Sequence, residues 1–295
     1  MSYIKAGTDA SGNDVKLFYQ DLNPANATST VVLIHGWPLS HEMWDYQLAE
    51  LPAHGLRVVA YDRRGFGKST QTWDGYDYDT LADDLKAVLD ELDLSNVTLV
   101  GFSMGGGEVA RYMSRYGGAR VAKVAFISAV TPYLLKTEDN PDGVDQSVFD
   151  EMTENIQKDR ADFLKTFAKQ FYGVGMLSQP VSQAHLDGDF ARAYVASHKA
   201  TLDCADSFAT TDFRDDLTQI QVPTLIIHGD SDKTVPIESS GERTANALPS
   251  AQYIVYEGEP HGLFVTSKDR LNEDLLAFIQ EGVAVRQAPE TTTIY

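Results

Sequence analysis

Short and nearly continuous apolar runs recur along the first half of the chain and again near its C-terminus. They cover residues 31–34, 58–61, 97–100, 121–127, 224–227 and 253–256. Strands that are buried on both faces have this composition, because helices cover both sides of a parallel sheet. Amphipathic helical patterns separate the runs. The alternation therefore predicts an α/β fold with a mostly parallel, doubly wound sheet.

One helical pattern carries its own start signal. Thr80 is expected to begin this helix, because Asp83 follows three residues later and completes a capping box. The apolar stripe that the helix would bury recurs at helical spacing and comprises Leu81, Leu85, Val88 and Leu92.

The strand pattern is interrupted between about Pro132 and Asp216, where we find only helical patterns with Gly and Pro breaks. Aromatic residues at positions 163, 167 and 171 share one helix face. We therefore predict that residues 132–216 form an inserted helical cap over the C-terminal edge of the sheet. Residues 1–131 and 217–282 would form the core. Residues 283–295 lack apolar periodicity and are expected to fray.

Composition narrows the classes of protein. The chain has 295 residues, of which 43% are hydrophobic, and a formal net charge of −19. That charge argues against nucleic acid and anionic membrane surfaces as partners. No apolar run approaches the ~18 residues that span a bilayer, and the N-terminus lacks an apolar signal region. The single Cys204 excludes an internal disulfide and is expected to be a buried thiol. These features favour a cytoplasmic protein with no membrane partner.

The segment Gly101–Gly105 reads G-x-S-x-G and lies between the apolar run 97–100 and a helical pattern over 104–116. A serine on such a sharp strand-to-helix turn presents its hydroxyl at the top of a sheet. The sequence therefore predicts Ser103 as a nucleophile rather than part of an ordinary Gly-rich turn. The glycines at 105–107 lack the register of a phosphate loop, so they favour close packing of helix on sheet. No His or Cys cluster has metal-ligand spacing, and we expect no metal and no cofactor.

A serine hydroxyl needs a base, and the base needs a third group to hold its tautomer. In this type of fold the acid and then the histidine follow the serine along the chain. Asp230 and Asp232 both follow the run 224–227. We favour Asp232, which lies further past the strand end, and expect Asp230 to cap the turn. His261 follows the run 253–256 and is the predicted base, since the other six histidines have plainer structural or surface roles.

The negative charge that develops on a substrate carbonyl oxygen needs preorganised donors. The backbone N–H of Met104 is one candidate, because it follows the nucleophile. The N–H of Trp37 is the second, because it follows the run 31–34. Pro38 has no N–H and biases Trp37 toward an extended conformation. The alternative role of Trp37, as a large core side chain, is compatible with a working backbone.

Five segments together resemble the bacterial arylesterase and cofactor-free haloperoxidase group of α/β-hydrolases. They are residues 35–40, 61–69, 101–107, 211–214 and 271–278, and the likeness spans about residues 13–281. The resemblance implies an α/β-hydrolase fold and a triad of Ser103, Asp232 and His261. It also implies a homo-oligomer, although residues 23–30 and the tail beyond 282 depart from the group's pattern. An aromatic acyl pocket under the cap is implied too, and its matching positions are Phe149, Phe163, Phe167 and Val235.

Members of this group hydrolyse small esters, and their peroxidase label reflects perhydrolysis, in which hydrogen peroxide replaces water on the acyl-enzyme. We therefore expect a serine carboxylesterase or arylesterase acting on short-chain esters. Alternatives are a perhydrolase, a hydrolase of small cyclic amides, and a hydrolase-like ligand receptor. Pro38 either resembles the members named as haloperoxidases or perhydrolases or only stiffens its loop. A haloalkane dehalogenase is disfavoured, because Ser103 stands where that enzyme needs a carboxylate.

Overall fold

The computed structural model describes residues 2–281, and within them eight strands form one sheet in the order β1-β2-β4-β3-β5-β6-β7-β8. Strands β3 to β8 run parallel, whereas β2 is antiparallel to both of its neighbours. The strands are β1 (Tyr3–Thr8), β2 (Asp14–Leu22), β3 (Ser29–Ile34), β4 (Leu56–Tyr61), β5 (Val97–Phe102), β6 (Val121–Ile127), β7 (Thr224–Gly229) and β8 (Gln252–Tyr256). The predicted mostly parallel sheet is confirmed, and its six apolar runs coincide with β3 to β8.

The sequence analysis does not predict strands β1 and β2, which form a hairpin. Their residues alternate between buried and exposed and form no continuous apolar run. The turn of the hairpin is set by Asp9, whose carboxylate accepts hydrogen bonds from the amides of Ser11 and Asn13. Gly12 follows at φ +81°, a left-handed conformation that glycine adopts without strain. The hairpin extends the sheet at one edge, remote from the loops that carry the candidate chemistry.

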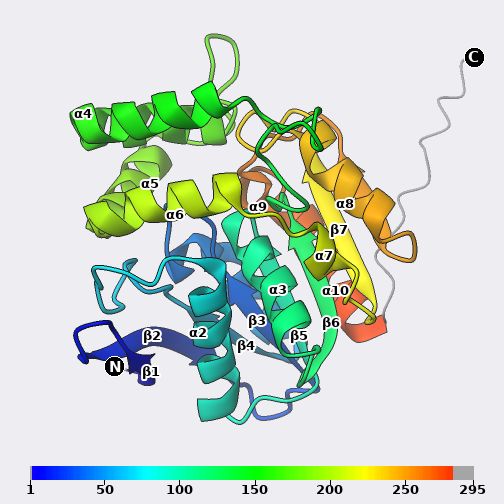
Figure 1. Cartoon of the computed structure of the whole chain (residues 1–295). Coiled ribbons are helices and arrows are strands. Elements are labelled where there is room, and N and C mark those ends of the chain that lie inside the picture. The colour runs from blue at the N-terminus through cyan, green and yellow to red at the C-terminus, as the bar shows by residue number, and fades with distance from the viewer. Residues whose placement is uncertain (1, 282–295) are drawn as a thin grey trace, which may run out of the picture.

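Helices cover both faces of the sheet (Figure 1). On one face α2 (Tyr78–Glu91), α3 (Met104–Arg115) and α8 (Gly241–Ala247) pack in a core cluster that includes Val32 and Ile34 of β3. On the other face, residues of α1 (Asp45–Glu50), α9 (Leu263–Thr266) and α10 (Lys268–Glu281) share a second cluster with Val31 and Leu33. Short 3-10 helices are η1 (His41–Trp44), η2 (Leu51–His54) and η3 (Ile237–Ser239). Because successive residues of β3 serve opposite faces, the strand must be apolar throughout.

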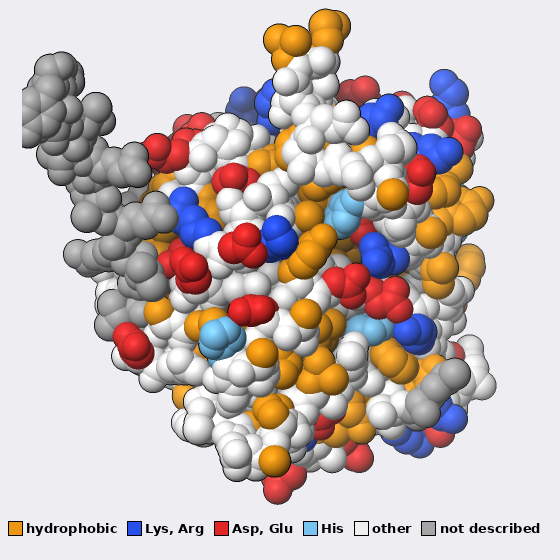
Figure 2. Space-filling view, turned by 180° about the vertical axis from the view of Figure 1, so that it is seen from behind, with side chains coloured by type: hydrophobic (Ala, Val, Ile, Leu, Met, Phe, Trp, Pro, Cys, Tyr) orange, Lys and Arg blue, Asp and Glu red, His pale blue; other side chains and the backbone are white. Residues whose placement is uncertain are grey.

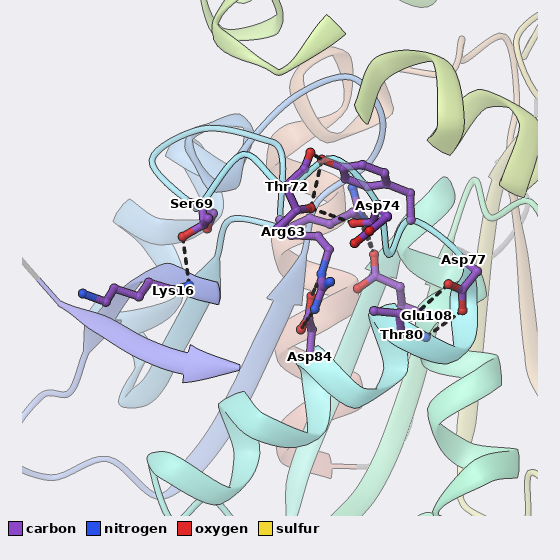
Figure 3. Close-up of polar contacts among 12 residues, drawn as sticks. Lys16, Arg63, Ser69, Thr72, Asp74, Asp77, Thr80, Asp84 and Glu108 are labelled. Atoms are coloured by element: carbon purple, nitrogen blue, oxygen red, sulfur yellow. Dashed lines mark hydrogen bonds and ion pairs between the residues drawn. The ribbon is translucent and has the colours of Figure 1, made fainter. Parts of the chain in front are cut away.

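The prediction that Thr80 begins a helix is wrong. Helix α2 begins at Tyr78, and its N-cap is Asp77, whose carboxylate accepts from the amide of Thr80 at 2.9 Å and from its hydroxyl at 2.8 Å. Figure 3 shows this cap. An aspartate accepts two hydrogen bonds here, so it satisfies the helix start better than a threonine inside the first turn. The predicted stripe is buried, apart from the partly buried Leu92 at the C-cap.

Between β6 and β7 the chain forms α4 (Gln146–Phe171), α5 (Gln183–Val195), α6 (His198–Thr210) and α7 (Arg214–Leu217). Figure 1 places α4, α5 and α6 together across one end of the sheet. The division into a core and a cap at residues 132 and 216 stays a prediction. The predicted frayed tail, residues 283–295, lies outside the described residues.

The surface carries charged side chains of both signs and some exposed apolar side chains. Figure 2 shows acidic and basic side chains interspersed over the face that it views, with apolar side chains at the tip of a projection. Met176 and Leu177, in the loop between α4 and α5, are each 99% exposed. Within residues 2–281 no helix combines the length and apolarity that crossing a membrane requires. Cys204 lies buried in α6, and burial raises the pKa of its thiol to about 12.

Two buried ion pairs join the loop after β4 to the helices on one face, and Figure 3 shows Asp84 of α2 and Glu108 of α3 pointing toward this loop. Asp84 receives two hydrogen bonds from Arg64, each 2.7 Å long, and burial raises its pKa to about 6. Arg63 pairs with Glu108 and also donates to the backbone carbonyl of His35 at 2.7 Å. The second pair therefore ties the loop after β3 to helix α3.

Candidate active site

Ser103 occupies a tight turn between β5 and α3. Its backbone has φ +53° and ψ −118°, a combination that L-residues rarely adopt, and its amide donates to the carbonyl of Ile127 at 2.9 Å. The flanking glycines are required by close backbone contacts. A Cβ on Gly101 would lie 2.5 Å from the carbonyl oxygen of Gly105, and one on Gly105 would lie 2.6 Å from that of Ile34. The G-x-S-x-G spacing therefore reflects how closely α3 crosses β3 and β5.

The structure brings Ser103, His261 and Asp232 together from three separate loops. The Nε2 atom of His261 lies 3.0 Å from the Oγ atom of Ser103, and its Nδ1 atom lies 2.6 Å from Oδ2 of Asp232. The imidazole is fully buried, and its ring centroid lies 4.8 Å from those of Phe102 and Phe171. Because a carboxylate only accepts, Nδ1 carries a proton, which leaves Nε2 free to accept from the serine hydroxyl. This arrangement can move a proton off Ser103.

The environment of Asp232 keeps its carboxylate charged. Burial alone would raise its pKa, but the neighbouring His261 and His228 outweigh this effect and hold the pKa well below its ordinary value. Its Oδ1 atom also accepts from the amides of Thr234 at 2.9 Å and Val235 at 2.8 Å. Hydrogen bonds to the charged form favour it, so the carboxylate can stabilise a positive charge on the adjacent imidazole.

Asp230, the rival acid, points elsewhere. Within its own turn, its Oδ1 atom accepts from the hydroxyl of Ser231 at 3.3 Å. Its carboxylate accepts from the amide of Gly258 at 2.7 Å, in the loop after β8. Because His261 belongs to the same loop, Asp230 helps to hold the two loops side by side.

The two predicted oxyanion donors lie in the loop after β3 and at the first residue of α3. Among the described residues, nothing accepts a hydrogen bond from the backbone amides of Trp37 and Met104. The Trp37 side chain is buried, and its indole N–H donates to the carbonyl of Thr201 in α6 at 3.0 Å. Its ring packs edge-on against Phe167 at 5.2 Å between centroids. The side chain of Trp37 therefore packs in the core, while its backbone N–H stays available.

A cavity of about 470 Å³ opens onto Ser103 and Trp37. All four predicted pocket residues line it: Phe149, Phe163, Phe167 and Val235. Buried apolar side chains, such as Val130 and Leu134, form part of the wall, and four exposed polar residues add to it: Glu151, Asn155, Gln170 and Lys233. The cavity can hold an apolar group beside the serine hydroxyl and a polar group nearer to solvent.

Sequence reasoning missed several lining residues. Phe208 of α6 and Met152 of α4 line the cavity, as does Val144 before α4. No motif identifies them, because their position depends on how the helices between β6 and β7 lie over the sheet. Within residues 2–281, no group of three or more His, Cys, Asp or Glu side chains is placed to hold a metal ion.

Comparison with known proteins shows the family of this chain. The family model described as the alpha/beta hydrolase fold matches residues 29–268. A non-heme chloroperoxidase of Kitasatospora aureofaciens is 41% identical, with 90% of this chain and 97% of the relative covered. A bifunctional esterase/perhydrolase of Acinetobacter calcoaceticus is 43% identical, with 90% and 96% covered.

Among solved structures, a bromoperoxidase from Bacillus anthracis is similar to this chain, with 47% sequence identity and a TM-score of 0.90. The likeness covers 95% of this chain and 99% of the bromoperoxidase chain. These three likenesses each extend over nearly the whole of this chain. The chain therefore belongs to the α/β-hydrolase family, among relatives named as non-heme haloperoxidases and esterase/perhydrolases, and it is a hydrolase.

Proposed function

We propose that this hydrolase is a serine esterase that cleaves small esters through an acyl-enzyme on Ser103. The observation that carries the proposal is the relay from Ser103 through His261 to Asp232, with spacings of 3.0 and 2.6 Å, beside a largely apolar cavity. The first distance suits proton transfer from Ser103 to His261, and the second suits a hydrogen bond that holds the imidazole in place. The order of the three residues along the chain is that of α/β-hydrolases.

In the acylation step, the Oγ atom of Ser103 attacks the ester carbonyl and its proton passes to Nε2 of His261. Asp232 stabilises the imidazolium that forms. The backbone N–H groups of Trp37 and Met104 would bind the oxyanion, and a single donor of this kind is worth about 3–4 kcal/mol of barrier. His261 then returns the proton to the leaving alcohol, so that the acyl group stays on Ser103.

The acyl-enzyme can be cleared by water or by hydrogen peroxide. His261 takes the proton of either nucleophile, which attacks the acyl carbon and releases Ser103. Water yields a carboxylic acid, and peroxide yields a peracid, which can oxidise a halide in solution. The names of the relatives support perhydrolysis as much as hydrolysis, since one is an esterase/perhydrolase and another a chloroperoxidase. We therefore propose perhydrolysis as the second activity of the same site.

A panel of p-nitrophenyl esters and small cyclic amides, assayed with and without hydrogen peroxide and a halide, tests this proposal. We expect multiple turnovers on short-chain esters and a loss of roughly 10³-fold or more in kcat for Ser103→Ala. Ser114→Ala, on the same helix α3, is the matched control and should keep full activity. Undiminished activity of Ser103→Ala would refute the mechanism.

The same panel separates the alternatives. A burst of one turnover followed by a stall would favour a ligand receptor over an enzyme. Faster cleavage of the cyclic amides than of the esters would favour the lactam hydrolase. Peracid formation far below ester hydrolysis, at saturating peroxide, would refute the perhydrolase activity.

A further inference from the structure

A second histidine lies against the same carboxylate as His261. His228 occupies the C-terminal end of β7, and its side chain is fully buried. Its Nε2 atom lies 2.9 Å from the carbonyl oxygen of Val235 and 3.3 Å from Oδ2 of Asp232. Because a carbonyl oxygen can only accept a hydrogen bond, Nε2 of His228 must carry a proton. That single N–H therefore faces two acceptors, the second of which is the candidate catalytic acid.

The carboxylate of Asp232 has donors on both of its oxygens. Oδ1 accepts from the amides of Thr234 and Val235, and Oδ2 accepts from His261 at 2.6 Å. His228 approaches that same Oδ2 atom. With four N–H groups converging on it, the carboxylate has no free direction in which to rotate. The oxygen that faces His261 is thus fixed by a group that takes no part in the proposed proton transfer.

His228 is in turn held rigidly. It belongs to a strand of the sheet and pairs in register with Val255 of β8, whereas Asp232 lies on the loop that follows. On the other side of the ring is the start of α8. A Cβ on Gly241 would lie 2.7 Å from Nδ1 of His228, so no side chain fits between helix and ring. Nδ1 has no hydrogen-bond partner among the described residues. The ring is therefore packed closely on one side and makes its hydrogen bonds on the other.

From this geometry we infer that His228 is a positioning residue that holds Asp232 in the orientation that His261 requires. The inference rests on the proposed function, since it concerns the same relay. His228 also fixes the backbone of Val235, whose amide binds Asp232 and whose side chain lines the cavity. The ring thus connects the catalytic acid to the wall of the acyl pocket. A histidine that served only to fill space would need neither hydrogen bond.

The test compares two replacements of the ring. His228→Leu fills similar volume but removes the donor, whereas His228→Gln keeps a side-chain N–H of similar reach. We expect kcat for a p-nitrophenyl ester to fall roughly 10- to 100-fold in His228→Leu, the range for one hydrogen bond to a charged group. KM should change by a smaller factor than kcat, and His228→Gln should recover most of kcat. An unchanged kcat in a folded His228→Leu would overturn the inference.

A double-mutant cycle separates positioning from general loss of structure. In an Asp232→Asn background, His228→Leu should lower kcat by less than about threefold, because its effect passes through Asp232. An equal loss in both backgrounds would contradict the inference. Tyr256→Phe removes a buried hydrogen bond from the neighbouring strand β8 without touching the relay, and it serves as the control for stability. Its kcat should equal that of the unaltered protein.

A measurement on the unaltered protein needs no variant to fold. In ¹⁵N-histidine-labelled protein, the NMR spectrum should show a proton on Nε2 of His228, and an Nε2 without a proton would overturn the inference. This result is independent of turnover. If the unaltered protein cleaved no ester, the proposed function would fail while the state of His228 could still be read. If the ester were cleaved and kcat of the folded His228→Leu variant stayed unchanged, only the positioning role would fail.

Discussion

Glu108→Gln tests the strength of the ion pair that ties helix α3 to the loop after β3. Glu108 is fully buried, its Oε1 atom pairs with Arg63, and its Oε2 atom accepts from the hydroxyl of Tyr61 at 2.7 Å. Burial raises the pKa of Glu108, and the charge of Arg63 opposes that rise. The amide preserves the shape of the side chain but removes its charge. The buried guanidinium then keeps the carbonyl of His35 as a neutral partner.

The expected loss is large for one substitution. Removing one partner of a buried ion pair typically costs about 3–5 kcal/mol of the free energy of unfolding. At roughly 2 °C per kcal/mol for a chain of this size, Tm should fall by roughly 6–10 °C. Replacing both members with apolar residues avoids the uncompensated charge. We therefore expect Arg63→Met combined with Glu108→Leu to lose less than the sum of the two single losses. Full recovery is not expected, because the His35 carbonyl and the Tyr61 hydroxyl are left unpaired at about 1–3 kcal/mol each.

Urea unfolding monitored by circular dichroism and thermal unfolding give the two readouts. Asp90→Asn is the matched control, because Asp90 of α2 pairs with Lys86 and Arg120 at the surface, and the substitution should cost less than about 1 kcal/mol. A Glu108→Gln variant that lost less than about 1 kcal/mol would refute the reasoning. So would a double variant whose loss equalled the sum of the two single losses, since that would mean that the two charges do not interact.

Three further outcomes follow from packing and protonation. Gly105→Ala should lower the free energy of unfolding by about 1–3 kcal/mol and reduce kcat, because its Cβ would meet the Ile34 carbonyl. The control Gly188→Ala, in α5, should raise the free energy of unfolding by about 0.5–1 kcal/mol. Equal effects of the two substitutions in urea unfolding would contradict this reasoning. Cys204, with its raised pKa, should react with a thiol reagent at pH 8 only after denaturant is added, and rapid modification of the folded protein would argue against its burial. Because the pKa of Asp232 is lowered from 3.8, its charge stabilises the fold above that pH and this contribution is lost as the pH falls through the folded-state pKa. The stability difference between Asp232→Asn and the unaltered protein should therefore be largest above about pH 5 and shrink below pH 4, and a difference that grew on acidification would be inconsistent with this sign.

The sequence predicts a strand well where both faces of the sheet are buried, because nearly every residue of such a strand is apolar. Strands β3 to β8 are recognisable because helices cover both sides of them. The β1–β2 hairpin at the edge has one exposed face, and its alternation over few residues is too weak to stand out. The start of α2 was misplaced because Thr80 and Asp77 both carry capping side chains, and only the structure shows which one lies outside the helix.

The same contrast holds in the site. Ser103, Asp232 and His261 can be chosen from the motif and from the order of acid and base along the chain. The role inferred for His228 could not be predicted in this way, because it depends on the contact of its ring, at the end of β7, with the carboxylate of Asp232 in the following loop. The partners of Glu108 come from β4 and from the loop that follows it. The contacts of Glu108 join distant segments and carry no local pattern, and the contact of His228 with Asp232 depends on the path of the loop between them. Neither can be predicted until the fold is known.

Because α4, α5 and α6 lie between β6 and β7, a mutation can change the cavity without changing the proposed acid–base residues, or the reverse. The proposed acid–base relay lies on loops after β5, β7 and β8, whereas more than half of the residues that line the cavity come from positions 132–216. Mutations in the inserted helices can therefore reshape the cavity while the relay keeps its spacing. Segments exchanged between relatives at the end of β6 and the start of β7 would change the lining of the cavity and leave Ser103, His261 and Asp232 in place. Changes in the cavity and changes in the relay can therefore accumulate independently of each other.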